Sequence, residues 1–383
     1  MKHKAHYQMC SRCVMDTSDP KIQFDMNGVC DHCNSFDRHI APVWNLETGG
    51  EEKIDSIIKR IKSKSKATDD YDCILGLSGG IDSSWLLHCA VKDWGLRPLV
   101  FHVDAGWNSD IAVSNINNLV EKLGLDLVTD VTDWDQVKNL QLSLFRSGTP
   151  HLDLSQDMAF FGTMFRFCEQ YGIKTILNGG NYSTECVRNP KDWIYYGTDL
   201  KFLYDVLKKY GDPEVDMSTF PFSGVLRHKF YLKYIKNISV ERPLNSFRYI
   251  KSEAIQKLNE LYGWKPYPQK HFESRFTKFY EGWWLPERFG FDTRRVQFSS
   301  LILTGQLQRS EALELLRRKS YPSELAEQDF EYVADKLGIP PIELQGYFDA
   351  PKKSYRDYRN QETLFNVGAW VLNKLGVERM KKR

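Results

Sequence analysis

The stretch Cys73–His88, with the sequence CILGLSGGIDSSWLLH, constrains the fold more than any other part of the chain. A short apolar segment runs into Ser-Gly-Gly, and an apolar helical pattern follows at once. Glycines at this point let the backbone turn sharply off a strand and approach a ligand without a Cβ clash. The N–H groups that begin the helix form, with its dipole, a site for an anion. The sequence therefore predicts a strand, a phosphate-binding loop and a helix.

Alternating strand and helix patterns follow this loop. Strand-like segments at 71–77, 97–106, 125–132 and 173–180 are separated by helical patterns. This alternation predicts an α/β fold with a doubly wound, mostly parallel sheet. Such sheets bind ligands at the carboxyl ends of their strands, so the polar segments that follow the strands should converge. These segments are Ser78–Ser84, Asp104–Asn108 and Asn178–Glu185.

We expect four units along the chain. They are a four-cysteine ribbon at 1–45, an amphipathic helix and linker at 46–70, the α/β domain at 71–240 and a helical C-terminal region at 241–383. Hydrophobic residues make up 42% of the chain and charged residues 27%, which is typical of a globular protein. A net charge of +2 gives no reason to expect nucleic-acid binding. There is no bilayer-length apolar run or secretory signal, so we expect a cytoplasmic protein without membrane contact.

Four of the eight cysteines lie in two Cys-x-x-Cys pairs near the N-terminus. Each pair presents two thiolates from one tight turn, and Asn27-Gly28 between the pairs predicts a hairpin that brings the turns together. Four protein ligands leave no open position, so we expect a structural Zn²⁺ site and not a catalytic one. An iron–sulfur cluster and a pair of redox dithiols are the alternatives. His32 and its neighbours His3 and His6 are interpreted as surface residues. The expected ligands are Cys10, Cys13, Cys30 and Cys33.

The predicted phosphate loop lacks the lysine that reaches the β- and γ-phosphates in common NTPases. Its sequence, SGGIDSS, resembles the SGGxDS signature of the PP-loop ATP pyrophosphatases, or adenine nucleotide alpha hydrolases. The resemblance implies a PP-loop (HUP-like) fold that holds pyrophosphate as a leaving group while a substrate oxygen attacks the α-phosphorus. It implies ATP and Mg²⁺ as ligands, with Asp82 able to cap the helix or reach the Mg²⁺. A Gly-rich turn with capping residues is the structural alternative.

The residues expected to bind the nucleotide come from three segments. Asp104 is the candidate for adenine or ribose, and the segment LNGGNYSTE is expected near the phosphates, with Glu185 as a weaker candidate. Capping by Asp104 and an ordinary glycine turn are equally good explanations of these two segments. The predicted set is Ser78, Gly79, Gly80, Ile81, Asp82, Ser83, Ser84, Asp104, Gly179, Gly180 and Asn181.

The whole-chain pattern is more specific. CSRCVMDTSDP, CDHC, GLSGGIDSS, LNGGN and KHFESRFTKFYEGWWLPERFGFDTRR together resemble the N-acetyl sugar amidotransferases of the WbpG and PseA type. The resemblance implies conversion of a sugar acetamido group, on a free or nucleotide-linked sugar, into an acetamidino group, in bacterial surface polysaccharide or flagellin-glycan biosynthesis. ATP would activate the amide oxygen and ammonia would displace AMP. A HisH-like glutaminase with a HisF-like partner is the implied ammonia source, since no built-in glutaminase motif occurs.

The last of these segments is rich in cations, which suit phosphates or a sugar carboxylate. On one helix, His271, Arg275 and Lys278 would share a face at i, i+4 and i+7. We expect Asp82, Lys270 and Arg275 to be catalytic. Weaker substrate-binding candidates are His271, Glu273, Lys278, Arg294 and Arg295. A solvated basic face beside aromatic core residues is the alternative.

Two other functions remain open. A tRNA-thiolating PP-loop enzyme usually needs further active-site cysteines, and Cys186 is the one to examine, since Cys73 and Cys89 lie in apolar, core-like contexts. A non-catalytic nucleotide-binding scaffold is the third possibility, and the complete loop with Asp82 argues against it.

Overall fold

The computed structural model describes residues 7–44, 50–66 and 68–374. At its centre lies a five-stranded, entirely parallel sheet in the order β3-β2-β1-β4-β5. The predicted α/β class is therefore confirmed, with one more strand than the four predicted. The strands are β1 (Cys73–Gly76), β2 (Pro98–Asp104), β3 (Leu127–Val131), β4 (Thr175–Leu177) and β5 (Ser239–Glu241).

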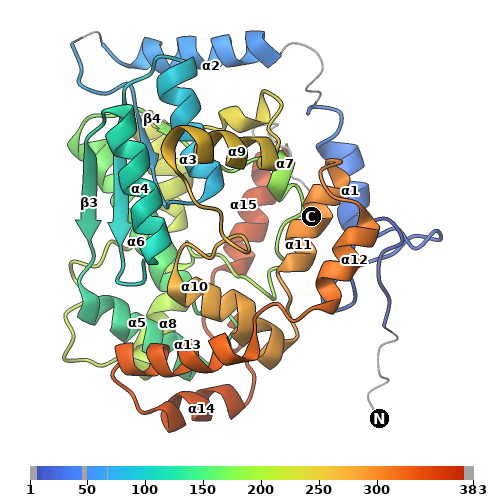
Figure 1. Cartoon of the computed structure of the whole chain (residues 1–383). Coiled ribbons are helices and arrows are strands. Elements are labelled where there is room, and N and C mark those ends of the chain that lie inside the picture. The colour runs from blue at the N-terminus through green and yellow to red at the C-terminus, as the bar shows by residue number, and fades with distance from the viewer. Residues whose placement is uncertain (1–6, 45–49, 67, 375–383) are drawn as a thin grey trace.

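Helices connect and follow the strands (Figure 1). The first eight α-helices are α1 (Asp31–His39), α2 (Gly50–Lys64), α3 (Ile81–His88), α4 (Asp110–Leu123), α5 (Trp134–Ser147), α6 (Leu154–Gln170), α7 (Tyr182–Glu185) and α8 (Leu200–Tyr210). The others are α9 (Lys251–Tyr262), α10 (Arg275–Phe279), α11 (Arg294–Leu303), α12 (Arg309–Arg317), α13 (Ser323–Lys336), α14 (Pro341–Asp349) and α15 (Glu362–Lys374). π-Helical turns are η1 (Cys89–Asp93), η2 (Arg227–Ile235) and η4 (Tyr280–Phe289), and 3₁₀ turns are η3 (Pro243–Asn245) and η5 (Tyr355–Asp357).

Alternation of side chains along the central strand places apolar residues on both faces of the sheet. In β1, Leu75 packs into a cluster with α2, α3, α4 and α9, whereas Ile74 packs into a second cluster with α6 and η2. Because both faces are covered, β1 reads as a continuous apolar run. This arrangement fixes the carboxyl end of β1, from which the glycine loop leaves.

Local signals set the ends of several helices. Ser109 caps α4 by accepting a hydrogen bond from the N–H of Ala112 (3.2 Å), and Gly124 ends this helix in the left-handed region with φ of 67°. Side-chain oxygens satisfy N–H groups that the first turn leaves unpaired, and glycine adopts positive φ without a Cβ penalty. The helix after β2 therefore begins and ends where the sequence predicts.

The C-terminal half is mainly helical, as predicted. β5 ends at Glu241, and α9 packs against α3 and α4, so residues just beyond 240 still belong to the layers around the sheet. Figure 1 shows α13 and α14 below the sheet and α11 and α12 beside α1. Among the residues with described positions, no helix combines the length and the apolarity needed to cross a bilayer.

Candidate active site

The glycine loop leaves β1 as a strand-to-helix turn. Gly79 has φ of +83°, and a Cβ there would lie 3.0 Å from the carbonyl oxygen of Ala112, so only glycine fits without strain. Gly80 is the N-cap of α3, and a Cβ on it would collide with the carboxylate of Glu273. The hydroxyls of Ser78 and Ser83 lie 3.3 Å apart. The turn therefore presents backbone N–H groups and two hydroxyls, which is what anion binding requires.

Not all seven loop residues face outward. The side chain of Ser84 is fully buried and accepts a hydrogen bond from the indole N–H of Trp264 (3.2 Å), and Ile81 is buried in the core. Trp264 and Tyr267 each donate to the carbonyl oxygen of Gly79 (3.2 Å). The loop is thus held in place by aromatic residues that follow α9, a contact that sequence patterns did not reveal.

Asp82 does not cap α3 but joins three segments of the chain. Its Oδ2 accepts from Nζ of Lys270 (2.9 Å), and its Oδ1 accepts from the hydroxyl of Tyr249 (2.7 Å) and Nδ2 of Asn181 (3.0 Å). Lys270 also donates to Glu185 Oε1 (2.6 Å). The predicted residues Asp82, Asn181 and Lys270 are therefore brought together, although they are up to 188 positions apart in sequence.

Two lysines, Lys270 and Lys251, lie near the glycine loop, which contains no lysine. Burial alone would raise the pKa of Asp82, but the charge and hydrogen bond of Lys270, together with the hydrogen bond from Tyr249 and the charge of Lys251, hold that pKa below its ordinary value. Burial lowers the pKa of Lys251, the first residue of α9, against the opposing charge of Asp82. Lys251 is close enough to Asp82, Lys270 and Glu273 for their charges to act on it, and sequence reasoning missed it.

Mg²⁺ prefers carboxylate oxygens, and two carboxylates adjoin the glycine loop. Asp82 lies in the first turn of α3, and the carboxylate of Glu273 lies against Gly80. Both oxygens of Asp82 already accept hydrogen bonds from this chain, so Glu273 is the carboxylate beside the loop that is more open to a cation. Glu273, a weaker substrate-binding candidate predicted from the sequence, therefore lies against the loop, and its carboxylate forms none of the described ion pairs.

A cavity of about 420 Å³ opens beside this cluster. It lies between the second glycine segment, the turn before α10, and the start of α11. Asn178, Gly180 and Asn181 form one wall, and Lys270 and His271 form another. The remaining lining comes from Ile40, Tyr182, Thr184, Glu185, Cys186, Val187, Arg188, Asn189, Arg242, Asn245, Glu281, Thr293, Val296 and Gln297. A cavity lined by polar and charged side chains beside such a loop is a candidate ligand site.

His271 faces this cavity but not from a helix, because it precedes α10 and has φ of +67°. Its Nδ1 is 3.0 Å from Glu281 Oε1, and Glu281 Oε2 also accepts from the hydroxyl of Thr293 (3.2 Å). Burial lowers the pKa of His271, but the charge and hydrogen bond of Glu281 outweigh it and raise the pKa to about 9. His271 is therefore held as a cation. Glu281 is a site residue that the sequence pattern did not identify.

The pKa of a carboxyl group at the start of α6 is also shifted. Asp153, at the start of α6, accepts a hydrogen bond from the hydroxyl of Thr277 (2.8 Å). Burial, followed by the charge of Asp157, raises the pKa of Asp153 to about 7, and the charge of Glu281 acts in the same direction. An acidic group that titrates near neutrality next to the site was not predicted, since no motif surrounds it.

The expected shared helix face of His271, Arg275 and Lys278 is wrong, because the helix begins only at Arg275. Arg275 Nε and Lys278 Nζ instead pair with opposite oxygens of Asp329 in α13, at 2.7 and 2.9 Å. Asp329 is 3% exposed and also accepts from the hydroxyl of Tyr321. The structure thus ties these two cations to the C-terminal helices, and they do not line the cavity.

Arg294 and Arg295 are also bound by this chain. The guanidinium of Arg294 contacts Asp292 (2.6 Å) and the carbonyl oxygens of Leu315 and Arg318. Arg295 pairs with Asp16 of the N-terminal segment (3.0 Å). Neither side chain lines the cavity, although their neighbours Thr293, Val296 and Gln297 do.

Asp104 lies at the carboxyl end of β2, where its Oδ1 accepts from the N–H of Gly106 (2.8 Å). It therefore shapes its own turn and does not cap the next helix, whose cap is Ser109, and its expected contact with adenine or ribose stays a prediction. Gly179 is closely packed, since a Cβ there would lie 3.2 Å from the backbone of Asp82. Asn181 caps α7, and Glu185 ends it.

The four N-terminal cysteines form a compact sulfur cluster. All are fully buried, and their ligand atoms lie within 4.8 Å of one another. Sγ–Sγ distances are 3.8 Å for Cys10–Cys33, 3.6 Å for Cys13–Cys30 and 3.7 Å for Cys30–Cys33. A tetrahedral Zn²⁺ with bonds of ~2.3 Å requires sulfur separations of ~3.8 Å. The residues therefore fit a closed, four-thiolate zinc site.

The ribbon that carries these cysteines packs on the helical region. Arg309 donates to the carbonyl oxygens of Cys13 (3.0 Å) and Cys10 (2.8 Å), and the N–H of Val14 donates to Ser299 (3.2 Å). The interpretation of His32 as a surface residue is wrong, because it is 5% exposed and its Nε2 lies 2.9 Å from Asp19. His3 and His6 lie outside the described residues.

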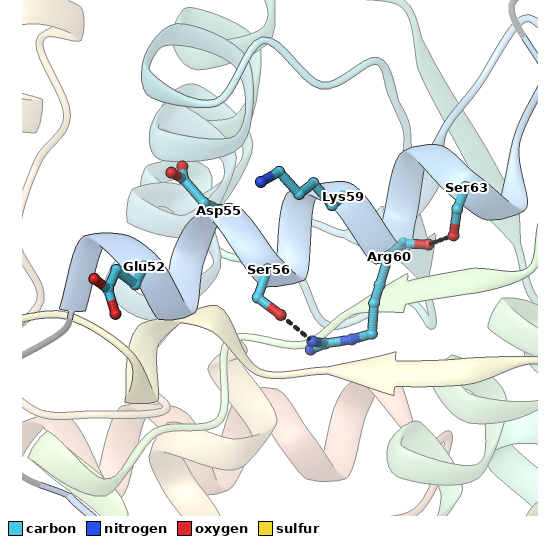
Figure 2. Close-up of a pocket in the computed structure, with 6 residues that line it drawn as sticks. All are labelled: Glu52, Asp55, Ser56, Lys59, Arg60 and Ser63. Carbon is cyan, nitrogen blue, oxygen red and sulfur yellow. Dashed lines mark hydrogen bonds between the residues drawn. The ribbon is translucent and has the colours of Figure 1, made fainter.

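A larger surface hollow of about 560 Å³ lies along α2, away from the glycine loop. Figure 2 shows its six lining residues, all from this one helix. Arg60 bonds to Ser56 (2.9 Å) and pairs with Glu241 (3.0 Å), so its charge is already compensated. A one-sided, solvent-exposed helix face offers no enclosure for a ligand, and we assign no site there.

Cys186 lines the cavity, but burial raises the pKa of its thiol to about 12. A sulfur-relay cysteine needs a thiolate near neutral pH, so this environment disfavours that role. Cys73 and Cys89 are buried in the core, as predicted.

Solved structures and one protein family are similar to parts of this chain. An ammonia-dependent NAD synthetase from Campylobacter jejuni has 16% identity and a TM-score of 0.28, covering 57% of this chain and 83% of its own. An NMN synthetase from Francisella tularensis has 15% identity and a TM-score of 0.28, covering 58% and 99%. A tRNA thiolase with a 4Fe–4S cluster from Methanococcus maripaludis has 13% identity and a TM-score of 0.28, covering 67% and 82%. Because these TM-scores are low, we infer nothing about activity from them.

No curated protein matches the chain. Residues 273–374 match the family described as the C-terminal domain of WbpG-like LPS biosynthesis proteins. This segment begins at Glu273, beside the glycine loop, and ends with α15. The C-terminal region is therefore similar to a WbpG-like domain, which confirms the resemblance predicted from the sequence.

Proposed function

We propose that this chain is an ATP-dependent amidotransferase that converts the acetamido group of a sugar, free or nucleotide-linked, into an acetamidino group. The proposal places this activity in bacterial surface polysaccharide or flagellin-glycan biosynthesis. The observation that carries it is the junction of two features: the glycine loop, and a cavity lined in part by Glu281, Thr293, Val296 and Gln297 of the WbpG-like region. Lys270 belongs to both, since it contacts Asp82 and lines the cavity.

The chemistry explains why both features are needed. An amide oxygen is a poor leaving group, so it must be activated before nitrogen can replace it. In the proposed reaction the acetamido oxygen attacks the α-phosphorus of ATP and pyrophosphate leaves. Ammonia then adds to the activated carbon, loses a proton, and AMP departs with the former amide oxygen. Loop N–H groups bind the leaving phosphates, and Lys270 and Lys251 offset their charge.

Protein side chains have defined tasks in this scheme. Asp82, assisted by Tyr249 and Asn181, orients Lys270 at the junction. His271, fixed by Glu281, presents a cationic ring to the cavity. Asp82 and Glu273 would hold the Mg²⁺, which neutralises phosphate charge when bound. A HisH-like glutaminase with a HisF-like partner would supply ammonia.

The test incubates the protein with Mg-ATP, ammonium and a diacetamido nucleotide sugar, and follows AMP, pyrophosphate and sugar mass. We expect sugar-dependent AMP release and a product one mass unit lighter, as oxygen is replaced by NH. AMP release stimulated by tRNA and by none of the acetamido sugars would support the thiolation alternative instead. Nucleotide binding without any turnover would favour the scaffold alternative.

A further inference from the structure

Two arginines in the cavity wall carry charge that the described chain does not compensate. Arg242 follows β5 directly, and Arg188 lies three residues after α7. In the described part of the chain neither side chain forms an ion pair or a hydrogen bond, whereas most of the described arginines do. Sequence motifs pointed to neither residue.

The nearby acids are already engaged elsewhere. Glu241, next to Arg242, pairs with Arg60 at 3.0 Å. In the cavity lining, Glu185 pairs with Lys270 (2.6 Å) and Glu281 with His271 (3.0 Å). Both arginines are exposed, so their guanidinium groups are open to solvent and to an anion that enters the cavity.

The position of Arg242 indicates which ligand it meets. A Cβ built on Gly180 would lie 3.9 Å from Arg242 Nε and 3.5 Å from Glu185 Oε2, so the Arg242 side chain lies along the second glycine segment, near Glu185 but without an ion pair to it. The lining of the cavity includes none of the loop residues Ser78 to Ser84. The arginines therefore face the acceptor side of the site and not the loop that would hold the phosphates of ATP.

A second observation indicates a ligand in the same place. The Oδ1 atom of Asn189, also in the lining, is buried without a hydrogen-bond partner in the described structure. A buried unpaired carboxamide is unfavourable unless a ligand donor satisfies it. A sugar hydroxyl or amide N–H next to an anionic group would match both Asn189 and the arginines.

We propose that Arg242, with Arg188 at the rim, forms an anion subsite for the acceptor, which reads a phosphate or carboxylate carried by the sugar. The inference rests on the proposed function for the identity of the sugar, but the subsite itself is defined by binding. Acceptor recognition is thereby assigned to Arg242 and Arg188, which lie outside the cation-rich segment, and not to the cations between positions 275 and 295. An arginine fork suits bidentate contact with either anion.

The experiment measures binding by calorimetry on the full chain with Mg²⁺ and saturating α,β-methylene-ATP, so that the glycine loop is occupied. The probes are uridine diphosphate N-acetylglucosamine and free N-acetylglucosamine. We expect the charged probe to bind more than tenfold tighter. Arg242→Ala should weaken that binding about tenfold to hundredfold, and Arg242→Lys less, because the charge remains while the fork is lost.

The matched control is Arg248→Ala, since Arg248 is exposed and pairs with Glu253 at 3.3 Å outside the cavity. It should leave both affinities unchanged. Equal binding of the two probes, or no binding of the charged probe, would overturn the subsite. So would an Arg242→Ala variant that loses affinity for the ATP analogue and keeps affinity for the sugar. If the charged probe binds but no AMP is released in the turnover assay, the result would contradict the proposed function and leave the subsite standing.

Discussion

The two ends of the segment Lys270–Arg295 use the same residue types for opposite purposes. At its start, Lys270 and His271 line a cavity and are held in position by Asp82 and Glu281. Farther on, Arg275, Lys278 and Arg295 are bound to carboxylates of other elements and do not reach the cavity. A cation's role thus depends on whether its partner carboxylate lies at a site or inside a helix interface.

The largest effect should come from removing the zinc that we expect in the N-terminal ribbon. This ribbon is the segment that Arg295 and Arg309 contact. Structural zinc contributes ~10 kcal/mol or more to small folds. We expect Cys33→Ser to abolish stoichiometric zinc and to lower the melting temperature by about 10 °C or more. Metal analysis and calorimetry check this. Cys186→Ala, outside the cluster, should keep full zinc content, and an iron–sulfur absorption in wild type would contradict the assignment.

Asp82→Ala tests the start of the segment Lys270–Arg295, where Lys270 lies at the candidate site. It removes the partner that places Lys270 beside the loop, so AMP formation should fall by about a thousandfold, as when a preorganised charge is lost. The fold should survive, because Lys270 keeps Glu185. Steady-state assays with circular dichroism would show this. Retained activity would remove Asp82 from the site.

Asp329→Asn is the matched change for the later part of that segment, where Arg275 and Lys278 are bound away from the cavity. Asp329 is buried and binds Arg275, Lys278 and Tyr321, so its replacement should destabilise the protein by about 3 kcal/mol. At a temperature where the variant is folded, turnover and KM should stay within about twofold of wild type. Urea unfolding and kinetics separate the two effects. A large rise in KM for the sugar would place Arg275 or Lys278 in the site after all.

The smallest effect is a pH dependence of acceptor binding. The pKa of His271 is raised to about 9, above its ordinary 6.5, so its charge is fully present below about 6.5 and is lost as pH rises through about 9. Any stability from the His271–Glu281 pair disappears over the same range. Glu281→Gln should shift the loss of sugar affinity toward lower pH. An NMR titration of His271 and affinities between pH 6 and 10 would check this, and an unshifted profile would exclude His271 from anion recognition.

Much of the fold followed from sequence because local signals agree with it. The apolar strand, Gly79 and the helix pattern defined the loop, and the Cys-x-x-Cys spacing defined the sulfur cluster. Proximity across the chain was harder to predict. Lys251, Arg242 and Glu281 carry no motif, and only the packing of α9, β5 and η4 brings them to the loop or the cavity.

The cation-rich segment shows why composition alone misleads. Charge density predicted a cluster of ligand-binding side chains, but side-chain direction decides which carboxylate each one meets. His271 lies in a left-handed turn before α10, so the helical spacing on which the shared face depended does not apply. Asp329, the residue that captures Arg275 and Lys278, lies more than 50 positions away and has no signal of its own.

Helix α11 contacts both the N-terminal ribbon and the cavity. Ser299 and Arg295 hold the ribbon, while Thr293, Val296 and Gln297 line the cavity from the start of the same short helix. If zinc and an acceptor bind as proposed, both would contact this helix, and thermodynamic linkage would make any coupling between them reciprocal. Acceptor would then protect the zinc from a chelator to the same degree that zinc tightens the acceptor.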